Sequence, residues 1–153
     1  PHFSSVKFAE WLTDEVDSVR LLGRDLNVTV DCSKLPENLT VDLDRKAMPY
    51  ALRNLLRNAF KYARSNIIVS AELLEKNILI HVDDDGIGIP PEEREHVFSA
   101  FTRLDRSRDR STGGYGLGLA ITRRVLELHG GSATADASPL GGARFTLSWQ
   151  AEQ

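Results

Sequence analysis

The segment VDDDGIGIP, residues 82–90, ends an apolar stretch with an Asp-x-Gly-x-Gly pattern. A carboxylate at the end of an apolar strand, here Asp84, is a polar group that needs a hydrogen-bond partner. Gly86 and Gly88 have no Cβ, so another molecule can approach their backbone closely. Because Asp-Gly also marks ordinary turns, the segment predicts a binding pocket only together with other elements.

Two further segments lie on either side of this one. NLLRNAFKY, residues 54–62, precedes it, and GYGLGLA, residues 114–120, follows it. The second is rich in glycine and the first carries a row of polar side chains. The three segments in this order predict a nucleotide pocket.

The composition restricts the class of protein. The chain has 153 residues, of which 41% are hydrophobic and 27% charged, as is typical of one globular domain or of a piece cut from a longer chain. A net charge of -3 predicts no nucleic-acid partner. The single cysteine, Cys32, excludes an internal disulfide and fits a reducing compartment. No apolar run is long enough for a transmembrane helix, and the abrupt start at Pro1 indicates an excised fragment.

Hydrophobic periodicity predicts helices that alternate with pairs of strands. We expect helices at residues 9–23, 44–63, 90–97 and 115–129, and strands at residues 27–31, 39–43, 66–74, 77–83, 132–137 and 143–149. Asp44 is the expected N-cap of the second helix. This order predicts an α+β fold, a two-layer α/β sandwich in which a mixed β-sheet carries its helices on one face.

The spacing of apolar residues also predicts which helix faces are buried. In the first helix these are Trp11, Leu12, Val16, Val19 and Leu22, and in the last they are Leu117, Ala120, Ile121, Val125 and Leu128. Residues 99–114 lack such spacing and are expected to form a loop. Their run of arginines fits either a solvated loop or a phosphate clamp.

The helix expected at residues 44–63 has an apolar face and a polar one. The polar face carries Asn54, Asn58, Lys61 and Tyr62. Asparagine is a poor helix former, so two of them in this row favour a functional face over a merely solvated one. The Asn58 amide oxygen suits a Mg²⁺ ion held mainly by phosphate and water, Lys61 can reach a phosphate, and Tyr62 can stack on a base.

Two features indicate which nucleotide would bind. The Asp84 carboxylate can accept a hydrogen bond from the amino group of adenine, whereas guanine would present a second acceptor, and an unpaired buried polar group costs ~1–3 kcal/mol. The glycines at 114, 116 and 118 precede a helix whose N-terminal amides attract phosphate. No strand comes directly before them and there is no P-loop, so a dinucleotide fold is not indicated.

Four segments together resemble a known family. Residues 54–62, 84–90, 97–105 and 114–120 resemble, in this order, the N, G1, F and G2 boxes of the catalytic ATP-binding domain of sensor histidine kinases, which has the GHKL (Bergerat) fold. The resemblance covers about residues 5–150, and residues 106–119 and 140–145 are most similar to RstB-type bacterial sensor kinases.

That resemblance implies ATP and Mg²⁺ as cofactors, with Asp84 at the adenine, Asn58 at the metal and residues 99–114 as a lid. It leaves open which of Arg103 and Arg110 contacts the γ-phosphate. The implied ATP-binding residues are Asn54, Asn58, Lys61, Tyr62, Asp84, Gly86, Gly88, Ile89, Arg103, Arg110, Gly114, Gly116, Leu117, Gly118 and Leu119.

The phosphoacceptor is expected outside this chain. Family members phosphorylate a histidine in a His-Glu/Asp-Leu-Arg-Thr-Pro segment, and none of the four histidines has that context: His2, His81, His96 and His129. The last of these is expected at a helix C-terminus, where histidine suits the dipole. The resemblance therefore implies that the chain holds no catalytic residue of its own and donates the γ-phosphate to a histidine on a separate dimerisation domain.

The resemblance to sensor histidine kinases further implies a homodimeric parent kinase, a cognate response regulator and a cytoplasmic position in an inner-membrane sensor. This fragment alone is expected to be monomeric.

Two other functions remain as alternatives. GHKL proteins that hydrolyse ATP to drive a conformational clamp resemble this chain but place a glutamate four residues before the metal-binding asparagine, where this chain has Asn54. An amide cannot accept a proton at neutral pH, which argues against hydrolysis. The third candidate is a module that binds nucleotide without catalysis, and the presence of Asn58, Asp84 and the lid glycines argues against it.

Overall fold

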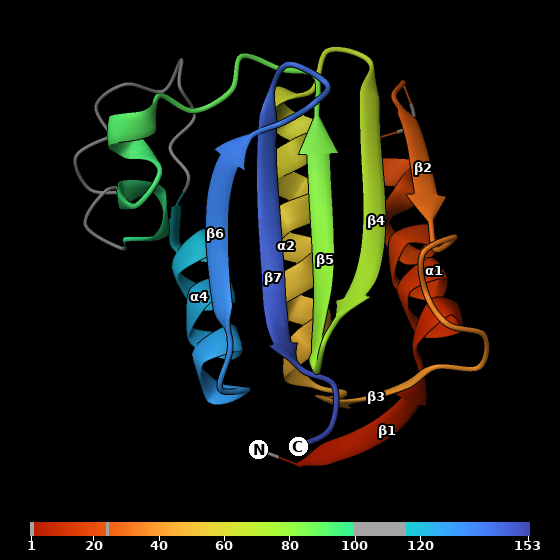
Figure 1. Cartoon of the computed structure of the whole chain (residues 1–153). Coiled ribbons are helices and arrows are strands. Elements are labelled where there is room, and N and C mark those ends of the chain that lie inside the picture. Colours follow the sequence, from red (N-terminus) through yellow and green to blue (C-terminus); the bar gives the residue numbers. More distant parts are fainter. Residues whose placement is uncertain (1, 24, 100–115) are drawn as a thin grey trace.

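The computed structural model describes residues 2–23, 25–99 and 116–153 (Figure 1). The helices and strands follow the chain in the order β1 (Phe3–Lys7), α1 (Phe8–Val19), η1 (Arg20–Gly23), β2 (Asn27–Asp31), β3 (Thr40–Asp44), α2 (Ala47–Tyr62), β4 (Asn66–Leu74), β5 (Asn77–Asp84), η2 (Pro91–Glu93), η3 (His96–Phe98), α4 (Gly116–Leu128), β6 (Ser132–Ala137) and β7 (Ala143–Gln150), where η marks a 3₁₀ turn.

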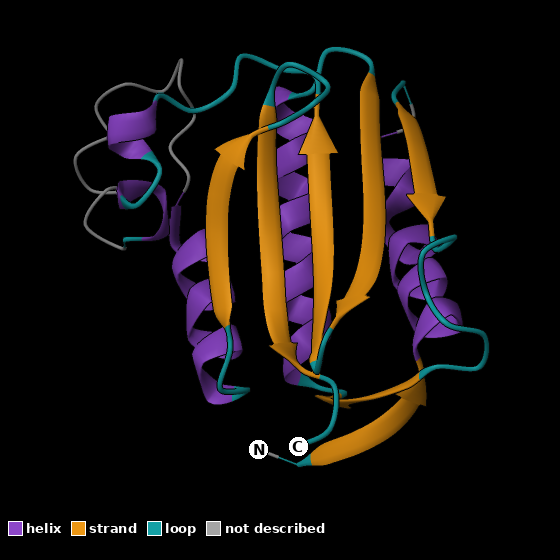
Figure 2. Cartoon of the chain, viewed as in Figure 1, coloured by secondary structure: helices purple, strands orange, loops and turns teal. Residues whose placement is uncertain are grey.

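The main sheet is mixed and carries its helices on one face. Its five strands lie in the order β2-β4-β5-β7-β6; β2 is parallel to β4 and the other neighbours are antiparallel. Helices α1, α2 and α4 lie behind this sheet in Figure 2, and its other face is open towards the viewer. The predicted two-layer fold class is confirmed. No helix in the described part of the chain has the length and apolarity that a bilayer crossing needs.

Helix α2 lies at the centre of the helical layer because one of its faces is apolar. Its buried residues recur every three or four positions and are Met48, Ala51, Leu52, Leu55, Leu56 and Ala59. Fully burying one large side chain of this kind contributes about 1.5–3 kcal/mol. Asp44 stabilises the start of α2, since its Oδ1 accepts hydrogen bonds from the amides of Lys46 and Ala47. Burial of the apolar face fixes the helix against the sheet, and this sets the position of Asn58 on its polar face.

Several local expectations were wrong. Strand β1 was not predicted, and it pairs with β3 in a separate antiparallel ribbon. Helix α1 ends at Val19 and tightens into η1, which changes the angle between successive side chains, so Leu22 is exposed rather than buried. The helix expected at residues 90–97 consists of the 3₁₀ turns η2 and η3.

The buried face of α4 also differs from the expected one. Val125 is buried as predicted, but Ile121 and Leu128 are 48% and 45% exposed. The buried side chains are instead Leu119, Thr122, Val125 and Leu126. The helix carries two apolar rows, and the buried row is the one that contains Thr122. The hydroxyl of Thr122 donates a hydrogen bond of 3.0 Å to the carbonyl of Ala51 on α2, which orients this row towards α2.

His129, directly after α4, is buried in the neutral state. Its side chain is 2% exposed. Its Nδ1 lies 2.8 Å from the carbonyl oxygen of Val125, to which it donates, and its Nε2 accepts a hydrogen bond of 3.0 Å from the amide of Asp44. Burial lowers the pKa of His129 below its ordinary value, and the hydrogen bond to Val125 and the nearby Asp44 carboxylate oppose this shift only in part. His129 lies at the C-terminus of α4 as expected, where its Nδ1 bonds the carbonyl oxygen of Val125.

This environment predicts that the protein loses stability in mild acid. The folded state binds the proton more weakly than the unfolded chain, so the contribution of His129 is complete above its unfolded pKa of 6.5 and is lost as the pH falls through the lower folded value. Urea unfolding midpoints measured from about pH 7.5 to 5 should fall. His129→Gln should flatten this dependence, and His2→Gln, at an exposed position, should not. An unchanged pH dependence in His129→Gln would contradict the assignment.

Candidate active site at the end of strand β5

Asp84, the last residue of β5, is a buried carboxylate with one oxygen occupied. It is 2% exposed. Its Oδ1 accepts hydrogen bonds from the amides of Gly86 at 2.9 Å and Ala143 at 3.2 Å. Burial raises the pKa of Asp84, as do the neighbouring charges of Asp85 and Asp83, whereas the two amide hydrogen bonds lower it. Both of these amide bonds fall on Oδ1, so neither occupies Oδ2.

The Asp84 side chain faces α2 across a small cavity. The described lining residues are Asn58, Tyr62, Asp84, Gly88, Ile89 and Ala143, and the cavity volume is about 10 Å³. No fully enclosed side-chain nitrogen or oxygen in the described part of the chain lacks a partner, so Oδ2 is not sealed off, and Asp84 lines this cavity. The space is close to that of one water molecule, and a purine enters only if the walls separate.

The structure thus brings together side chains that lie far apart in the sequence. Asn58, Tyr62, Asp84 and Ile89 were expected at a nucleotide site, and they line one cavity with Gly88. The Asn58 side chain makes no hydrogen bond to the residues that the structure describes. Its amide oxygen is therefore available to a ligand.

The glycines of this site are required by the protein itself. A Cβ on Gly86 would collide with the carbonyl oxygen of Tyr62, so only glycine lets the turn pass the end of α2. Gly88 has a φ of 76°, a left-handed conformation that favours glycine. A Cβ on Gly142 would collide with Oδ1 and the carbonyl oxygen of Asp84. Close approach of a ligand was the expected role of Gly86 and Gly88, whereas Gly142 was not among the predicted site residues.

Asn54 connects α2 to the start of α4. Its Nδ2 donates a hydrogen bond of 3.2 Å to the carbonyl of Gly118, which the hydroxyl of Thr122 also reaches at 3.1 Å. A Cβ on Gly118 would lie 3.4 Å from Asn54 Cγ, so the two elements are close. Asn54 thus fixes the beginning of the helix that follows the glycine-rich segment.

The other expected site residues have different positions. Lys61 is exposed, and its Nζ lies 5.7 Å from the centroid of the Tyr62 ring. Leu119 is buried in the core of the helical layer. Gly116 begins α4. Arg103, Arg110 and Gly114 lie outside the described residues. The rest of the expected lid also lies outside them, apart from Ser99, and so does the side chain of Leu117.

Asp85 was missed by the sequence reasoning, which considered only one carboxylate of the run. Its Oδ1 accepts from the amides of Arg64 and Ser65, and its Oδ2 accepts from the amide and side chain of Asn66. The hydrogen bonds from Ser65, Asn66 and Arg64 lower the pKa of Asp85 to about 2. Because these residues directly follow α2, Asp85 holds the end of that helix beside the β5 turn.

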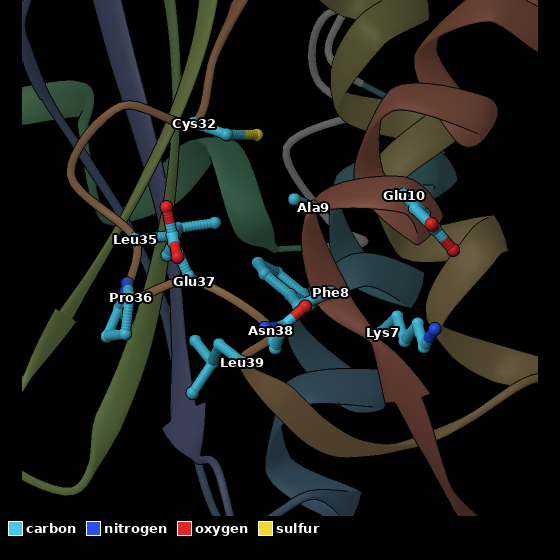
Figure 3. Close-up of a pocket in the computed structure, with 10 residues that line it drawn as sticks. All are labelled: Lys7, Phe8, Ala9, Glu10, Cys32, Leu35, Pro36, Glu37, Asn38 and Leu39. Carbon is cyan, nitrogen blue, oxygen red and sulfur yellow. The ribbon is translucent and has the colours of Figure 1, made fainter.

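A larger cavity lies elsewhere, between the start of α1 and residues 32–39 (Figure 3). Its volume is about 300 Å³, and Phe8, Cys32 and Leu39 are among its lining residues. Burial raises the pKa of the Cys32 thiol, which makes this sulfur a poor nucleophile. The cavity lacks an aligned carboxylate and glycine turn of the kind found at Asp84. We therefore place the candidate active site by its chemistry rather than by cavity size.

Comparisons with known proteins identify relatives of this chain. The family model for histidine kinase-, DNA gyrase B-, and HSP90-like ATPases matches residues 43–153. The sensor protein RstB of Escherichia coli (strain K12) is 42% identical over 148 residues, which are 97% of this chain and 34% of RstB. The chain thus spans about a third of the length of this curated relative.

Solved structures show the same fold. The catalytic domain of histidine kinase ThkA, in a nucleotide-free form, superposes with a TM-score of 0.84 at 23% identity, with 100% of both chains covered. The ATP binding domain of PrrB from Mycobacterium tuberculosis superposes with a TM-score of 0.78 at 27% identity, again with 100% of both chains covered.

Proposed function

The chain belongs to the family of histidine kinase-, DNA gyrase B-, and HSP90-like ATPases, and from this membership we propose that it is the catalytic domain of a sensor histidine kinase that donates the γ-phosphate of Mg²⁺-ATP to a histidine on another domain. The observation that carries the proposal is the buried Asp84 carboxylate, held by two amides on one oxygen and open to a cavity on the other.

The Asp84 carboxylate is suited to adenine. Its Oδ2 accepts a hydrogen bond from the 6-amino group of the base, and its fixed Oδ1 sets the direction of that contact. Tyr62 and Ile89, which line the same cavity, provide the surfaces between which the ring is placed. Guanine would face Oδ2 with a carbonyl oxygen, so the site discriminates against it by ~1–3 kcal/mol.

The residues present fit a metal ion that arrives with the nucleotide. The described residues contain no group of three or more His, Cys, Asp or Glu that could hold a metal ion alone. Mg²⁺ typically takes one or two protein oxygens and completes its shell with phosphate and water. Asn58 supplies such an oxygen beside the cavity, Lys61 approaches the phosphates, and the bound ion would neutralise their charge.

Transfer to histidine fits this site better than hydrolysis does. Transfer breaks the bond from the γ-phosphorus to the β–γ bridging oxygen and forms a bond to an imidazole nitrogen, so the domain need only position and stabilise charge. Asn54 is engaged with the carbonyl of Gly118 as a donor, a role that a glutamate base could not fill. This contact supports the kinase function over that of a hydrolytic clamp.

The remaining partners follow from the proposed function. The phosphoacceptor lies on a dimerisation domain of the same kinase, which then passes the phosphoryl group to a response regulator. We place the catalytic domain formed by this chain on the cytoplasmic side of an inner-membrane sensor. The parent kinase is a homodimer, and the chain alone is a monomer without a phosphoacceptor.

Asp84→Asn tests the base assignment. The carbonyl oxygen of the new side-chain amide can keep both backbone hydrogen bonds, so its NH₂ group would face the amino group of adenine. ATP affinity measured by calorimetry should fall by roughly tenfold or more, while GTP binds relatively better than before. The parent protein should prefer ATP to GTP.

Asp31→Asn is the matched control, because Asp31 is an exposed residue at the end of β2. It should bind ATP as the parent does. Equal affinity of the parent for ATP and GTP, or an Asp84→Asn variant that binds ATP with parental affinity, would exclude Asp84 as the adenine acceptor.

A further inference from the structure

The carboxylate before Asp84 lies on the opposite face of the sheet and is fully paired there. Successive side chains of a strand point to opposite faces, so Asp83 points to the open face. It is 3% exposed. Arg144, directly across from it on β7, donates to both of its oxygens, from Nε at 2.8 Å and from Nη2 at 3.0 Å. This is the two-pronged geometry in which an arginine–carboxylate pair is strongest.

A second donor ties the β6–β7 loop to the same carboxylate. The hydroxyl of Ser138 donates to Asp83 Oδ1 at 2.8 Å and accepts from the amide of Leu140 at 3.0 Å. The loop closes on itself through the amide of Ser138, which donates to the carbonyl of Gly142 at 2.8 Å. One end of the loop is thus fixed to Asp83 on the open face.

The other end of this loop forms the wall of the base pocket. The amide of Gly142 donates to the carbonyl of Asp84 at 3.1 Å, and the amide of Ala143 donates to Asp84 Oδ1. Ala143 also lines the cavity. The β6–β7 loop and Ala143 therefore bond two consecutive residues of β5, Asp83 on one face of the sheet and Asp84 on the other. We expect a shift at Asp83 to move the amide of Ala143, which holds Asp84 Oδ1.

We propose that Asp83, Arg144 and Ser138 are positioning residues for base recognition, which hold the Asp84 carboxylate and the Ala143 wall in the geometry that selects the adenine amino group. This inference rests on the proposed function. An exposed ion pair would contribute little, but the Asp83 carboxylate is buried, and loss of one partner leaves its charge uncompensated. The contacts among Asp83, Arg144 and Ser138 thus act on the selectivity of the site for the base as well as on the stability of the fold.

The test measures base recognition separately from general affinity. Purine riboside triphosphate is ATP without the 6-amino group, so the ratio of its dissociation constant to that of ATP reports the Asp84 contact alone. We expect a ratio of roughly tenfold or more in the parent protein. Arg144→Gln should reduce it by about tenfold, and Ser138→Ala, which removes one hydrogen bond and leaves the ion pair in place, by about threefold.

Glu15→Gln is the matched control. It removes a carboxylate that pairs with Arg53 and leaves the contacts among Asp83, Arg144 and Ser138 in place. Its melting temperature should fall while its ratio stays parental. An unchanged ratio in folded Arg144→Gln and Ser138→Ala would overturn the inference, and Ser138→Ala alone decides if Arg144→Gln does not fold. A parent ratio near one would instead overturn the proposed base assignment, and with it this inference.

Discussion

Replacing Asn58 with alanine is expected to abolish the magnesium-dependent part of ATP binding. Asn58 lines the cavity beside Asp84, and its side chain makes no hydrogen bond to the described residues. Without that oxygen, the ion has no protein ligand among the residues that we assign to it and is held by phosphate and water alone. Phosphoryl transfer should fall by roughly two orders of magnitude or more, the range that follows removal of one preorganised electrostatic contact.

Calorimetry with and without EDTA measures this effect directly. The parent protein should bind ATP more tightly with Mg²⁺ than in EDTA, and Asn58→Ala should bind equally in both. Arg57→Ala, on the exposed face of the same helix, is the control and should keep the difference. A magnesium dependence that survives in Asn58→Ala would remove Asn58 from the metal site.

Gly142→Ala is expected to destroy the base pocket from within the protein. The added Cβ would collide with Oδ1 and the carbonyl oxygen of Asp84 and with the amide of Gly86. These atoms belong to a buried strand end and cannot yield separately, so the β6–β7 loop must move away and lose its hydrogen bonds to Asp84. We expect a loss of stability of about 1–3 kcal/mol from overpacking and a fall in ATP affinity of roughly tenfold or more.

The neighbouring Gly141 provides the control. It has a φ of 101°, but a Cβ there meets no atom within 4 Å. Gly141→Ala should therefore cost about 1–2 kcal/mol of stability through backbone strain alone and should bind ATP like the parent. Thermal unfolding and calorimetry distinguish the two variants. Parental ATP affinity in Gly142→Ala would show that the contact of this loop with Asp84 does not shape the site.

Much of the fold follows from local patterns in the sequence. Helix α2 was predicted because its apolar face repeats over many turns, and β4 and β5 because two apolar runs flank a short turn. The glycine and asparagine motifs, in their order along the chain, then predicted a nucleotide pocket. The structure confirms the fold class and brings Asn58, Tyr62 and Asp84 to one cavity.

What could not be predicted depends on contacts between distant segments. Helix α4 has two apolar rows, and the choice between them depends on the hydrogen bond from Thr122 to Ala51, 71 residues earlier. The neutral state of His129 depends on the amide of Asp44, 85 residues away. No pattern near either residue contains that information.

The run of three aspartates illustrates the same limit. All three are alike in the sequence, yet Asp83 pairs with Arg144, Asp84 faces the cavity, and Asp85 holds the residues after α2. The alternation of side chains along the strand predicts that Asp83 and Asp84 point to opposite faces of the sheet, but not which residues each carboxylate contacts. The role of Gly142 likewise could not be predicted, because it depends on Asp84 being packed against it.

The central claim, that this domain supplies the γ-phosphate to a histidine on another domain, is tested most directly with ATP radiolabelled at the γ-position. The assay combines the chain with a separate helical hairpin that bears a His-Glu/Asp-Leu-Arg-Thr-Pro segment. We expect acid-labile label on the hairpin, appearing slowly because no tether raises its effective concentration, and none on this chain. Asp84→Asn should greatly slow the labelling, and folded His129→Gln should leave it nearly unchanged. Label on this chain alone, or release of inorganic phosphate without transfer, would contradict the account.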